Sequence, residues 1–308
     1  MEFKINGGAW PTMITLFTPD GKLDESLNRL AAKRLADMGS GGIFAVCQSS
    51  EMFFLSIEEK VKLARLVKEE IGSDVSLVVS GHTADALEEQ ISDLKQLNTV
   101  GADALVLVTN RLDPKNEGFE IFKRNTQAIL DALPNTVFGL YECPYPSLRL
   151  LSDEELIWCA KTGRIRFLKD VSCNAEVQTR RVKLTEGTQL KLYNANTETL
   201  LHSLRCGYTG YNGVMGNFHI DLYKWLCSHM DDEKADYVQK ELFEMSLIEK
   251  VSYPVNAKYY LQLKGYNASV FTRSKSRDLL SEEEKDKVLR QLKRETALRG
   301  ELDLPMQR

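Results

Sequence analysis

Short apolar segments recur along this chain at intervals of about thirty residues, and this repeat constrains the fold more than any other feature. A stretch with helical spacing of apolar residues follows most of these segments. The predicted strands end near seven positions, spaced 33, 28, 32, 28, 25 and 19 residues apart: Gln48, Gly81, Thr109, Tyr141, Lys169, Asn194 and Gly213. Together with a first strand from Gly8 to Phe17, they predict an α/β fold, a (β/α)8 TIM barrel.

An open, doubly wound parallel sheet is the alternative architecture for such a repeat. It is disfavoured because no strand is followed by a glycine-rich dinucleotide loop. Capping boxes beginning at Ser56 and Ser152 indicate helix starts between the strands.

The pattern changes beyond residue 225, where only helices are predicted. They span 232 to 250 and 253 to 264, and a third helix begins at a further capping box, Ser281 to Glu284. We therefore expect a barrel domain over residues 1–225 and a C-terminal helical extension over residues 226–308.

Charge and composition narrow the class of protein. The net charge is -4 and the pI about 5.8, without a basic cluster, so a nucleic-acid partner is not expected. The N-terminus lacks the apolar core of a signal peptide, and no apolar run is long enough to span a membrane. We expect a cytoplasmic protein, and the six scattered cysteines are typical of reduced thiols.

Two predicted neighbouring strands end in ionisable side chains, Tyr141 and Lys169, where parallel-sheet enzymes carry their chemistry. A lysine inside a barrel mouth is costly to keep charged, so burial lowers its pKa and raises the fraction of neutral amine. A neutral amine attacks ketones to form a Schiff base. The alternative is that Lys169 pairs with Asp170 or a nearby carboxylate and only holds the barrel together.

The segments Leu140 to Pro144 and Phe167 to Asp170 resemble the tyrosine-x-x-proline and isoleucine-lysine-glutamate signatures of the dihydrodipicolinate synthase and N-acetylneuraminate lyase superfamily. The resemblance implies a class I, pyruvate-dependent aldolase in which Lys169 forms the imine and Tyr141 moves protons. It also implies a C-terminal helical extension and a homotetramer.

Further site residues follow from the same resemblance. Cys47 to Glu51 occupies the place of the family's glycine-threonine-threonine-glycine-glutamate loop, so Ser49 and Ser50 are expected to hold the substrate carboxylate. Gln48 replaces the threonine that links to the catalytic tyrosine. Alternatively, this is a polar loop that caps the next helix.

Polar residues at the last two strand ends suit a hydroxyl-bearing substrate, although solvated loop residues are an equal explanation. They are Asn194, Asn196 and Asn212.

The chain departs from the family at two places. Arg111 and Leu112 stand where the family often has a tyrosine pair, and Pro146 stands where the dihydrodipicolinate synthases have an arginine. Arg149 replaces that arginine only if the loop differs. These changes weaken the prediction of a condensation with aspartate semialdehyde.

We therefore expect a lysine-dependent lyase or aldolase that joins pyruvate and an aldehyde, acting on a 2-keto-3-deoxy sugar acid or an N-acetylneuraminate-like substrate. The alternatives are a dihydrodipicolinate synthase, a non-catalytic paralogue that binds keto acids, and a bare scaffold with Lys169 in an ion pair. No cofactor or metal is expected, because the four histidines have no ligand spacing.

Overall fold

Eight parallel strands form the centre of the computed structural model, which describes residues 4–250 and 252–305. The strands are β1 Gly8–Pro11, β2 Gly42–Ala45, β3 Ser76–Val79, β4 Ala104–Val108, β5 Phe138–Tyr141, β6 Ile165–Asp170, β7 Lys191–Asn194 and β8 Gly210–Gly213. They follow the order β1-β8-β7-β6-β5-β4-β3-β2. A bridge between Thr12 and Phe44 joins the two ends of the sheet, and Met13 N donates to Phe44 O at 3.0 Å. This closure confirms the predicted barrel and rules out the open sheet.

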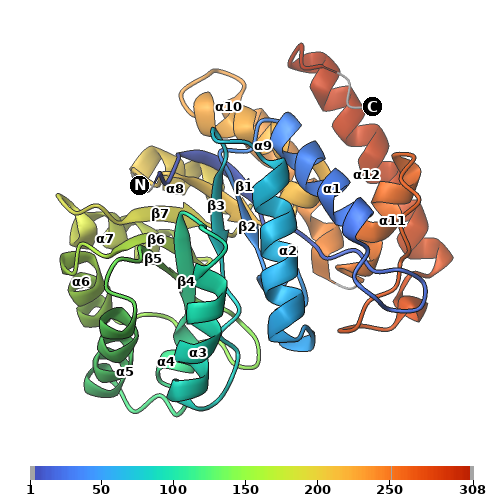
Figure 1. Cartoon of the computed structure of the whole chain (residues 1–308). Coiled ribbons are helices and arrows are strands. Elements are labelled where there is room, and N and C mark those ends of the chain that lie inside the picture. The colour runs from blue at the N-terminus through green and yellow to red at the C-terminus, as the bar shows by residue number, and fades with distance from the viewer. Residues whose placement is uncertain (1–3, 251, 306–308) are drawn as a thin grey trace.

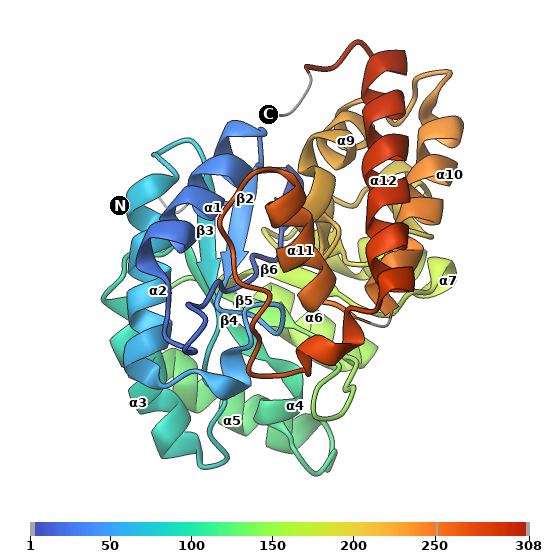
Figure 2. The same ribbon diagram turned by 90° about the vertical axis from the view of Figure 1, so that its right-hand side faces the viewer.

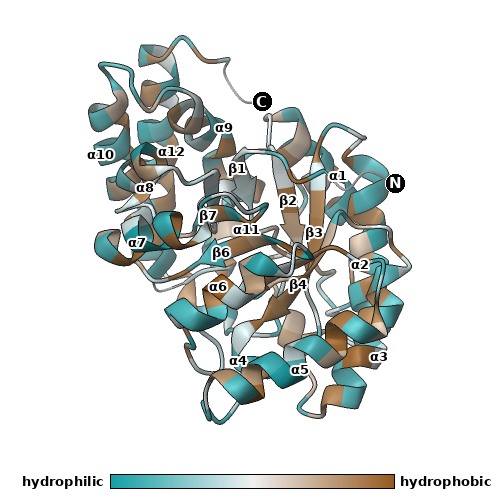
Figure 3. Ribbon diagram, turned by 90° about the vertical axis from the view of Figure 1, so that its left-hand side faces the viewer, coloured by the Kyte–Doolittle hydropathy of each residue, from teal (hydrophilic) through white to brown (hydrophobic). Residues whose placement is uncertain are grey.

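Helices surround the strands on the outside of the barrel (Figure 1). They are α1 Glu25–Asp37, α2 Ile57–Glu70, α3 Leu87–Asn98, α4 Thr109–Leu112, α5 Phe119–Ala132, α6 Asp153–Lys161, α7 Ala175–Thr185, α8 Leu200–Cys206 and α9 Gly216–Ser228, with a 3₁₀ turn, η1, at Met52–Phe54. The capping boxes at Ser56 and Ser152 are both formed, as predicted. Apolar residues concentrate on the strands and the inner faces of the helices, while the outer helix faces are hydrophilic (Figure 3).

Aromatic side chains fill the interior of the barrel. Trp10 packs on Phe167 with ring centroids 5.4 Å apart, and Phe167 stacks on Tyr193 at 4.7 Å. All three are fully buried. A filled interior leaves the carboxyl ends of the strands as the open face of the barrel, as is usual for this fold.

The first strand is shorter than predicted, because it ends at Pro11 instead of Phe17. Beyond it, side-chain amides replace a strand ladder: Ile14 N donates to Asn217 Oδ1 and Leu16 N donates to Asn28 Oδ1. The backbone groups are satisfied in this way without a neighbouring strand.

The C-terminal extension is helical, as predicted, and packs against one side of the barrel (Figure 2). It consists of α10 Ala235–Ser246, η2 Leu247–Lys250, α11 Val255–Leu263, η3 Arg277–Leu279 and α12 Glu282–Glu301. The capping box predicted at Ser281 is only half formed. Ser281 accepts from Glu284 N, but the Glu284 carboxylate binds Ser252 and Lys287.

Buried ion pairs join the extension to the barrel. Lys258 on α11 pairs with Glu51 at 3.0 Å, and Arg299 on α12 pairs with Asp221 on α9 at 2.7 Å. The division at residue 225 stays a proposal, and that residue lies within α9. Within the described ranges, no helix combines the length and apolar character that crossing a membrane requires. The cytoplasmic location stays a prediction.

Candidate active site

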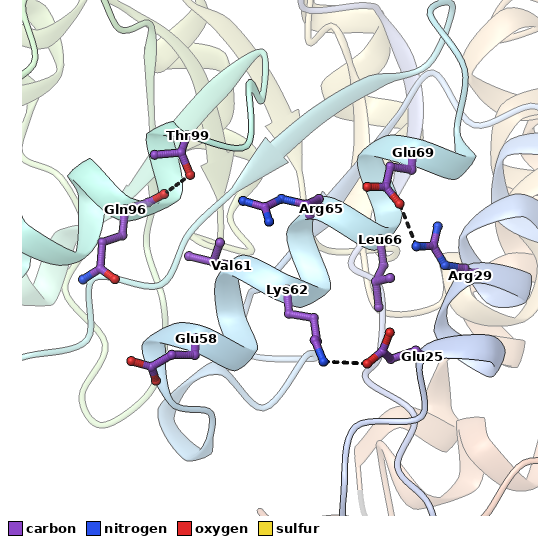
Figure 4. Close-up of a pocket in the computed structure, with 10 residues that line it drawn as sticks. All are labelled: Glu25, Arg29, Glu58, Val61, Lys62, Arg65, Leu66, Glu69, Gln96 and Thr99. Carbon is purple, nitrogen blue, oxygen red and sulfur yellow. Dashed lines mark hydrogen bonds and ion pairs between the residues drawn. The ribbon is translucent and has the colours of Figure 1, made fainter.

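A broad groove on the outside of the molecule, between α1, α2 and α3, is not the site. Four of its charged side chains form ion pairs: Lys62 with Glu25 at 2.5 Å and Arg29 with Glu69 at 2.6 Å (Figure 4). Neither Tyr141 nor Lys169 lines it. Charges that already have partners at an exposed surface offer little to a ligand.

Lys169 and Tyr141 lie side by side at the ends of β6 and β5, where they are register partners. The Lys169 Nζ atom is 4.4 Å from the centroid of the Tyr141 ring and 5.8 Å from that of Phe44. The lysine is only 4% exposed, and burial lowers its pKa. No carboxylate among residues 4–250 and 252–305 forms an ion pair with it within 4.0 Å. A lowered pKa increases the fraction of the amine that is neutral and nucleophilic.

The acidic residues that follow the pair in sequence point the other way. Glu142 and Asp170 both bind Arg181 of α7, through contacts from Nη1 of 2.9 Å to Glu142 Oε2 and 2.9 Å to Asp170 Oδ2. Successive strand residues face opposite sides, so Lys169 faces into the barrel and Asp170 faces α7. The predicted alternative in which Lys169 pairs with Asp170 is therefore not what the structure has.

Tyr141 is held by Gln48, which lies on the loop after β2. The Tyr141 hydroxyl donates to Gln48 Oε1 at 3.2 Å. Burial raises the pKa of Tyr141 well above its usual value, so the phenol stays protonated at neutral pH. Although Gln48 replaces the threonine expected at this position, its side chain still contacts the hydroxyl of Tyr141.

The two serines of this loop have different surroundings. Ser49 lines a cavity, and its hydroxyl is 3.0 Å from that of Thr12. Ser50 is fully buried, donates to Met13 O at 2.6 Å and accepts from Cys47 N. It is not among the residues that line the cavity, and its hydroxyl shapes the loop. A role of Ser50 in holding a substrate carboxylate stays a prediction.

The cavity itself has a volume of about 260 Å³ and lies beside Tyr141. Barrel residues make one part of its wall: Gln48, Ser49, Glu51, Phe53, Phe54, Tyr141, Tyr145 and Val214. The extension supplies the rest: Tyr253, Pro254, Ser274 and Lys275. The four residues from the extension were not anticipated from the sequence, because nothing in their local pattern distinguishes them from packing residues.

Tyr253 completes a group of hydroxyls at the cavity wall. It accepts a hydrogen bond from Asn217 Nδ2 at 3.0 Å and interacts with the hydroxyls of Ser49 and Thr12. Burial raises its pKa well above the usual value, so it remains a neutral donor. Several short donors that converge on one point suit a small carboxylate.

A network of buried contacts holds the extension over the cavity. The Glu51 carboxylate pairs with Lys258, and it also accepts from the backbone of Arg273 and Ser274 at 2.6 and 2.8 Å. The Arg273 side chain in turn pairs with Glu59 of α2. The segment that carries Ser274 is therefore fixed to the barrel loop that carries Ser49.

The three predicted asparagines do not line this cavity. Asn194 donates to Thr199 and Ser203, Asn196 accepts from Thr199, and Asn212 donates to the carbonyl of Trp10. These contacts hold the ends of β7 and β8. Lys169 is not a lining residue of this cavity either, and substrate binding by the three asparagines stays a prediction.

The two arginines at the departures from the family also have partners. Arg149 is 7% exposed and pairs with Asp113 at 2.8 Å and Glu155 at 2.6 Å. Arg111 pairs with Asp85 at 2.5 Å and lies over the ring of Phe53. Arg149 is thus not available to bind a second substrate carboxylate.

Glu249, on η2 of the extension, is a further ionisable group at this end of the barrel. Burial raises the pKa of its carboxyl to about 7, and the positive charge of Lys169 opposes that shift. The negative charge of Glu249 in turn raises the pKa of Lys169. Across the part of the chain that the structure describes, no group of three or more His, Cys, Asp or Glu side chains could hold a metal ion.

The chain is similar in sequence to known proteins. Residues 6–295 match the model of the dihydrodipicolinate synthetase family. A 4-hydroxy-tetrahydrodipicolinate synthase from Synechococcus sp. (strain CC9902) is 29% identical over 203 residues, and this match spans 66% of each chain.

Solved structures share the whole fold. A chloride-inhibited dihydrodipicolinate synthase from Acinetobacter baumannii in complex with pyruvate has a TM-score of 0.84 and 21% identity, over 94% of this chain and 99% of that one. The N-acetylneuraminate lyase of Proteus mirabilis has a TM-score of 0.82 and 17% identity, over 93% and 97% of the two chains. At these identities the likeness is one of fold.

Proposed function

This chain belongs to the dihydrodipicolinate synthetase family, and from that membership and the site we propose that it is a Schiff-base lyase that takes pyruvate or a longer 2-keto acid. The observation that carries the proposal is the Lys169 amine, which is buried without an ion-pair partner among the described residues and lies against the Tyr141 phenol beside a cavity. A buried neutral amine forms imines at a pH where an exposed lysine is charged.

The reaction follows from these groups. Lys169 attacks the C2 ketone, and water leaves as the imine forms. In the synthetic direction C3 loses a proton, the enamine attacks the aldehyde carbon, and the aldehyde oxygen takes up a proton. Water then hydrolyses the imine and restores the amine, and cleavage runs the same steps in reverse. Tyr141 carries the proton to and from the oxygens, because it is the protonated phenol closest to the amine.

The carboxylate of the keto acid binds at Ser49 in this proposal. Tyr253 and Thr12 supply the adjacent hydroxyls. Neutral hydroxyls satisfy a carboxylate without placing a second positive charge near Lys169, which would otherwise compete for the same anion. No cofactor enters any step, since the imine itself is the electron sink.

The identity of the aldehyde is a finer question. A 2-keto-3-deoxy sugar acid or N-acetylneuraminate-like substrate is the class expected from the sequence, and aspartate semialdehyde is the alternative. The latter loses support because Arg149 is paired with two carboxylates. A paralogue that binds keto acids without turnover is a further alternative, and a homotetramer is proposed from the resemblance to the family.

Borohydride reduction in the presence of pyruvate, followed by peptide mass mapping, tests the proposal. We expect a stable adduct on Lys169 and none on Lys258, a buried lysine paired with Glu51 that serves as the internal control. The absence of an adduct on Lys169 would reject the imine. If the adduct is found, turnover of any 2-keto acid would exclude the alternative of a paralogue that binds keto acids without catalysis.

A further inference from the structure

Aromatic rings form the outer wall of the cavity. Phe53 and Phe54 come from η1 after β2, and Tyr145 comes from the loop after β5. The rings of Phe53 and Tyr145 meet edge to face with centroids 4.8 Å apart. Val214 and Pro254 add apolar surface to the same cavity. This wall contrasts with the hydroxyls of Ser49 and Tyr253.

Phe53, in the middle of the aromatic wall, is held on two sides. The guanidinium of Arg111 lies 5.4 Å from the centroid of the Phe53 ring, and Asp85 holds that guanidinium through an ion pair. Phe53 therefore has contacts from both Arg111 and Tyr145 that restrict its orientation. A fixed aromatic surface binds a flat apolar group at low entropic cost.

Two of these rings are unusually exposed. Phe54 is 43% exposed and Tyr145 is 45% exposed, although both line a cavity. Large aromatic side chains grouped at a cavity mouth are typical of a surface that a ligand covers. The exposed apolar area is therefore best explained by a bound group that removes it from water.

Charged groups near this wall already have partners. Glu51 pairs with Lys258, and Arg273, which precedes the lining residue Ser274, pairs with Glu59. On the extension side of the cavity, Ser274 supplies a hydroxyl and Lys275 a charged amine. A volume of about 260 Å³ is also small beside the roughly 300–1,000 Å³ of pockets for drug-sized ligands. Size and lining together favour a small, flat aldehyde.

We propose that the aldehyde partner at this site is aromatic, with its ring held between Phe54 and Tyr145. This inference rests on the proposed function. It assigns an apolar aldehyde to the site, where the sequence led us to expect a hydroxyl-rich one. The chemistry is an addition without redox change: the enamine carbon derived from the pyruvate methyl group bonds to the aldehyde carbon. The oxygen gains the proton carried by Tyr141, and hydrolysis releases a 4-aryl-4-hydroxy-2-oxo acid.

The test compares condensation of pyruvate with benzaldehyde, glyceraldehyde and aspartate semialdehyde by the intact protein. We expect kcat/KM for benzaldehyde to be at least tenfold above that for glyceraldehyde. Phe54→Ala and Tyr145→Ala should each lower this ratio at least fivefold. Leu148→Ala is the matched control, because Leu148 is 53% exposed on the same loop as Tyr145 but does not line the cavity, and it should keep the ratio. Preference for either polar aldehyde, or an equal effect of Leu148→Ala, would overturn the proposal.

A binding measurement separates this inference from the proposed function. Lys169→Met cannot form an imine, so titration of this variant with 4-phenyl-2-oxobutanoate and with 2-oxobutanoate reports on the wall alone. We expect at least tenfold tighter binding of the phenyl compound, and equal binding would contradict the inference even if pyruvate forms the imine. A change in oligomeric state in Phe54→Ala and Tyr145→Ala without a change in the aldehyde ratio would instead assign the rings to a subunit interface, and the proposal would be wrong.

Discussion

The Tyr141 hydroxyl donates to the side-chain oxygen of Gln48 across 3.2 Å, and this contact joins β5 to the loop after β2. An amide oxygen only accepts, so Gln48 orients the phenol without passing a proton onward. In the proposed mechanism, the proton that Tyr141 moves then comes from the substrate or from water in the cavity. We therefore propose that Gln48 is a positioning residue.

Gln48→Leu removes the acceptor while keeping a side chain of similar size. We expect turnover to fall about tenfold, because the phenol loses its fixed direction and small misplacements of a catalytic group are costly. Borohydride trapping of pyruvate should persist, since Lys169 is untouched. Steady-state kinetics beside the trapping assay checks this, and unchanged turnover would remove Gln48 from the mechanism.

Tyr141→Phe tests the proton carrier directly. The ring that packs on Lys169 stays in place, while the only group that can move a proton at that position is lost. General acid–base groups contribute roughly 10²- to 10⁴-fold, so turnover should fall within that range with imine trapping still detectable. Retention of more than half of the turnover would contradict the assigned role.

Tyr253→Phe tests the contribution of the extension to binding. Loss of one hydroxyl from the carboxylate site should raise the KM for pyruvate about tenfold and change kcat less, because a bond made equally in ground and transition states affects binding. Tyr259→Phe, at a partly buried tyrosine of α11 outside the cavity lining, is the control and should behave as the parent protein. Equal effects of the two changes would reject the role of Tyr253.

Glu249→Gln should shift the pH dependence of imine formation. The negative charge of Glu249 raises the pKa of Lys169, so its removal lowers that pKa and increases the neutral amine at a given pH. The midpoint of the trapping rate against pH should therefore move to lower pH. Glu244→Gln, on the adjacent helix α10 and paired with Arg294, should leave the midpoint in place. A shift of this midpoint to higher pH in Glu249→Gln would contradict the expected lowering of the Lys169 pKa.

Arg181→Met should destabilise the barrel strongly. It leaves the buried carboxylates of Glu142 and Asp170 without their common cation, and breaking such a buried pair typically costs about 3–5 kcal/mol. Arg180→Met removes an exposed pair with Asp153 and should cost less than about 1 kcal/mol. Urea unfolding of both variants measures the difference in the free energy of unfolding. Equal losses would contradict a larger contribution from the buried ion pairs of Arg181.

Local patterns in the sequence were enough to predict the barrel and the placement of Tyr141 beside Lys169. Strand periodicity and the capping boxes at Ser56 and Ser152 act over a few residues, so they can be read without knowing the packing. The pairing of Tyr141 with Lys169 followed because consecutive parallel strands of a barrel are neighbours.

Which side chains face the site was harder to predict, since a shift of one residue along a strand or loop reverses the face. Asn194 points toward α8 while Tyr193 before it packs inside the barrel, and Ser50 binds backbone while Ser49 meets the cavity. The predicted strand ends at Tyr141, Asn194 and Gly213 agree with β5, β7 and β8, but the position of a strand end does not tell which of two neighbouring side chains faces the site.

The amino-acid sequence by itself determined the repeating strand–helix architecture and the position of Lys169 near the end of a strand, because both depend on interactions between residues close along the chain. Only the tertiary structure decided the lining of the cavity. Tyr253 and Ser49 are about two hundred residues apart, and their contact depends on how the extension docks through Lys258 and Glu51. Such contacts arise from packing between distant segments, for which a linear pattern holds no local signal.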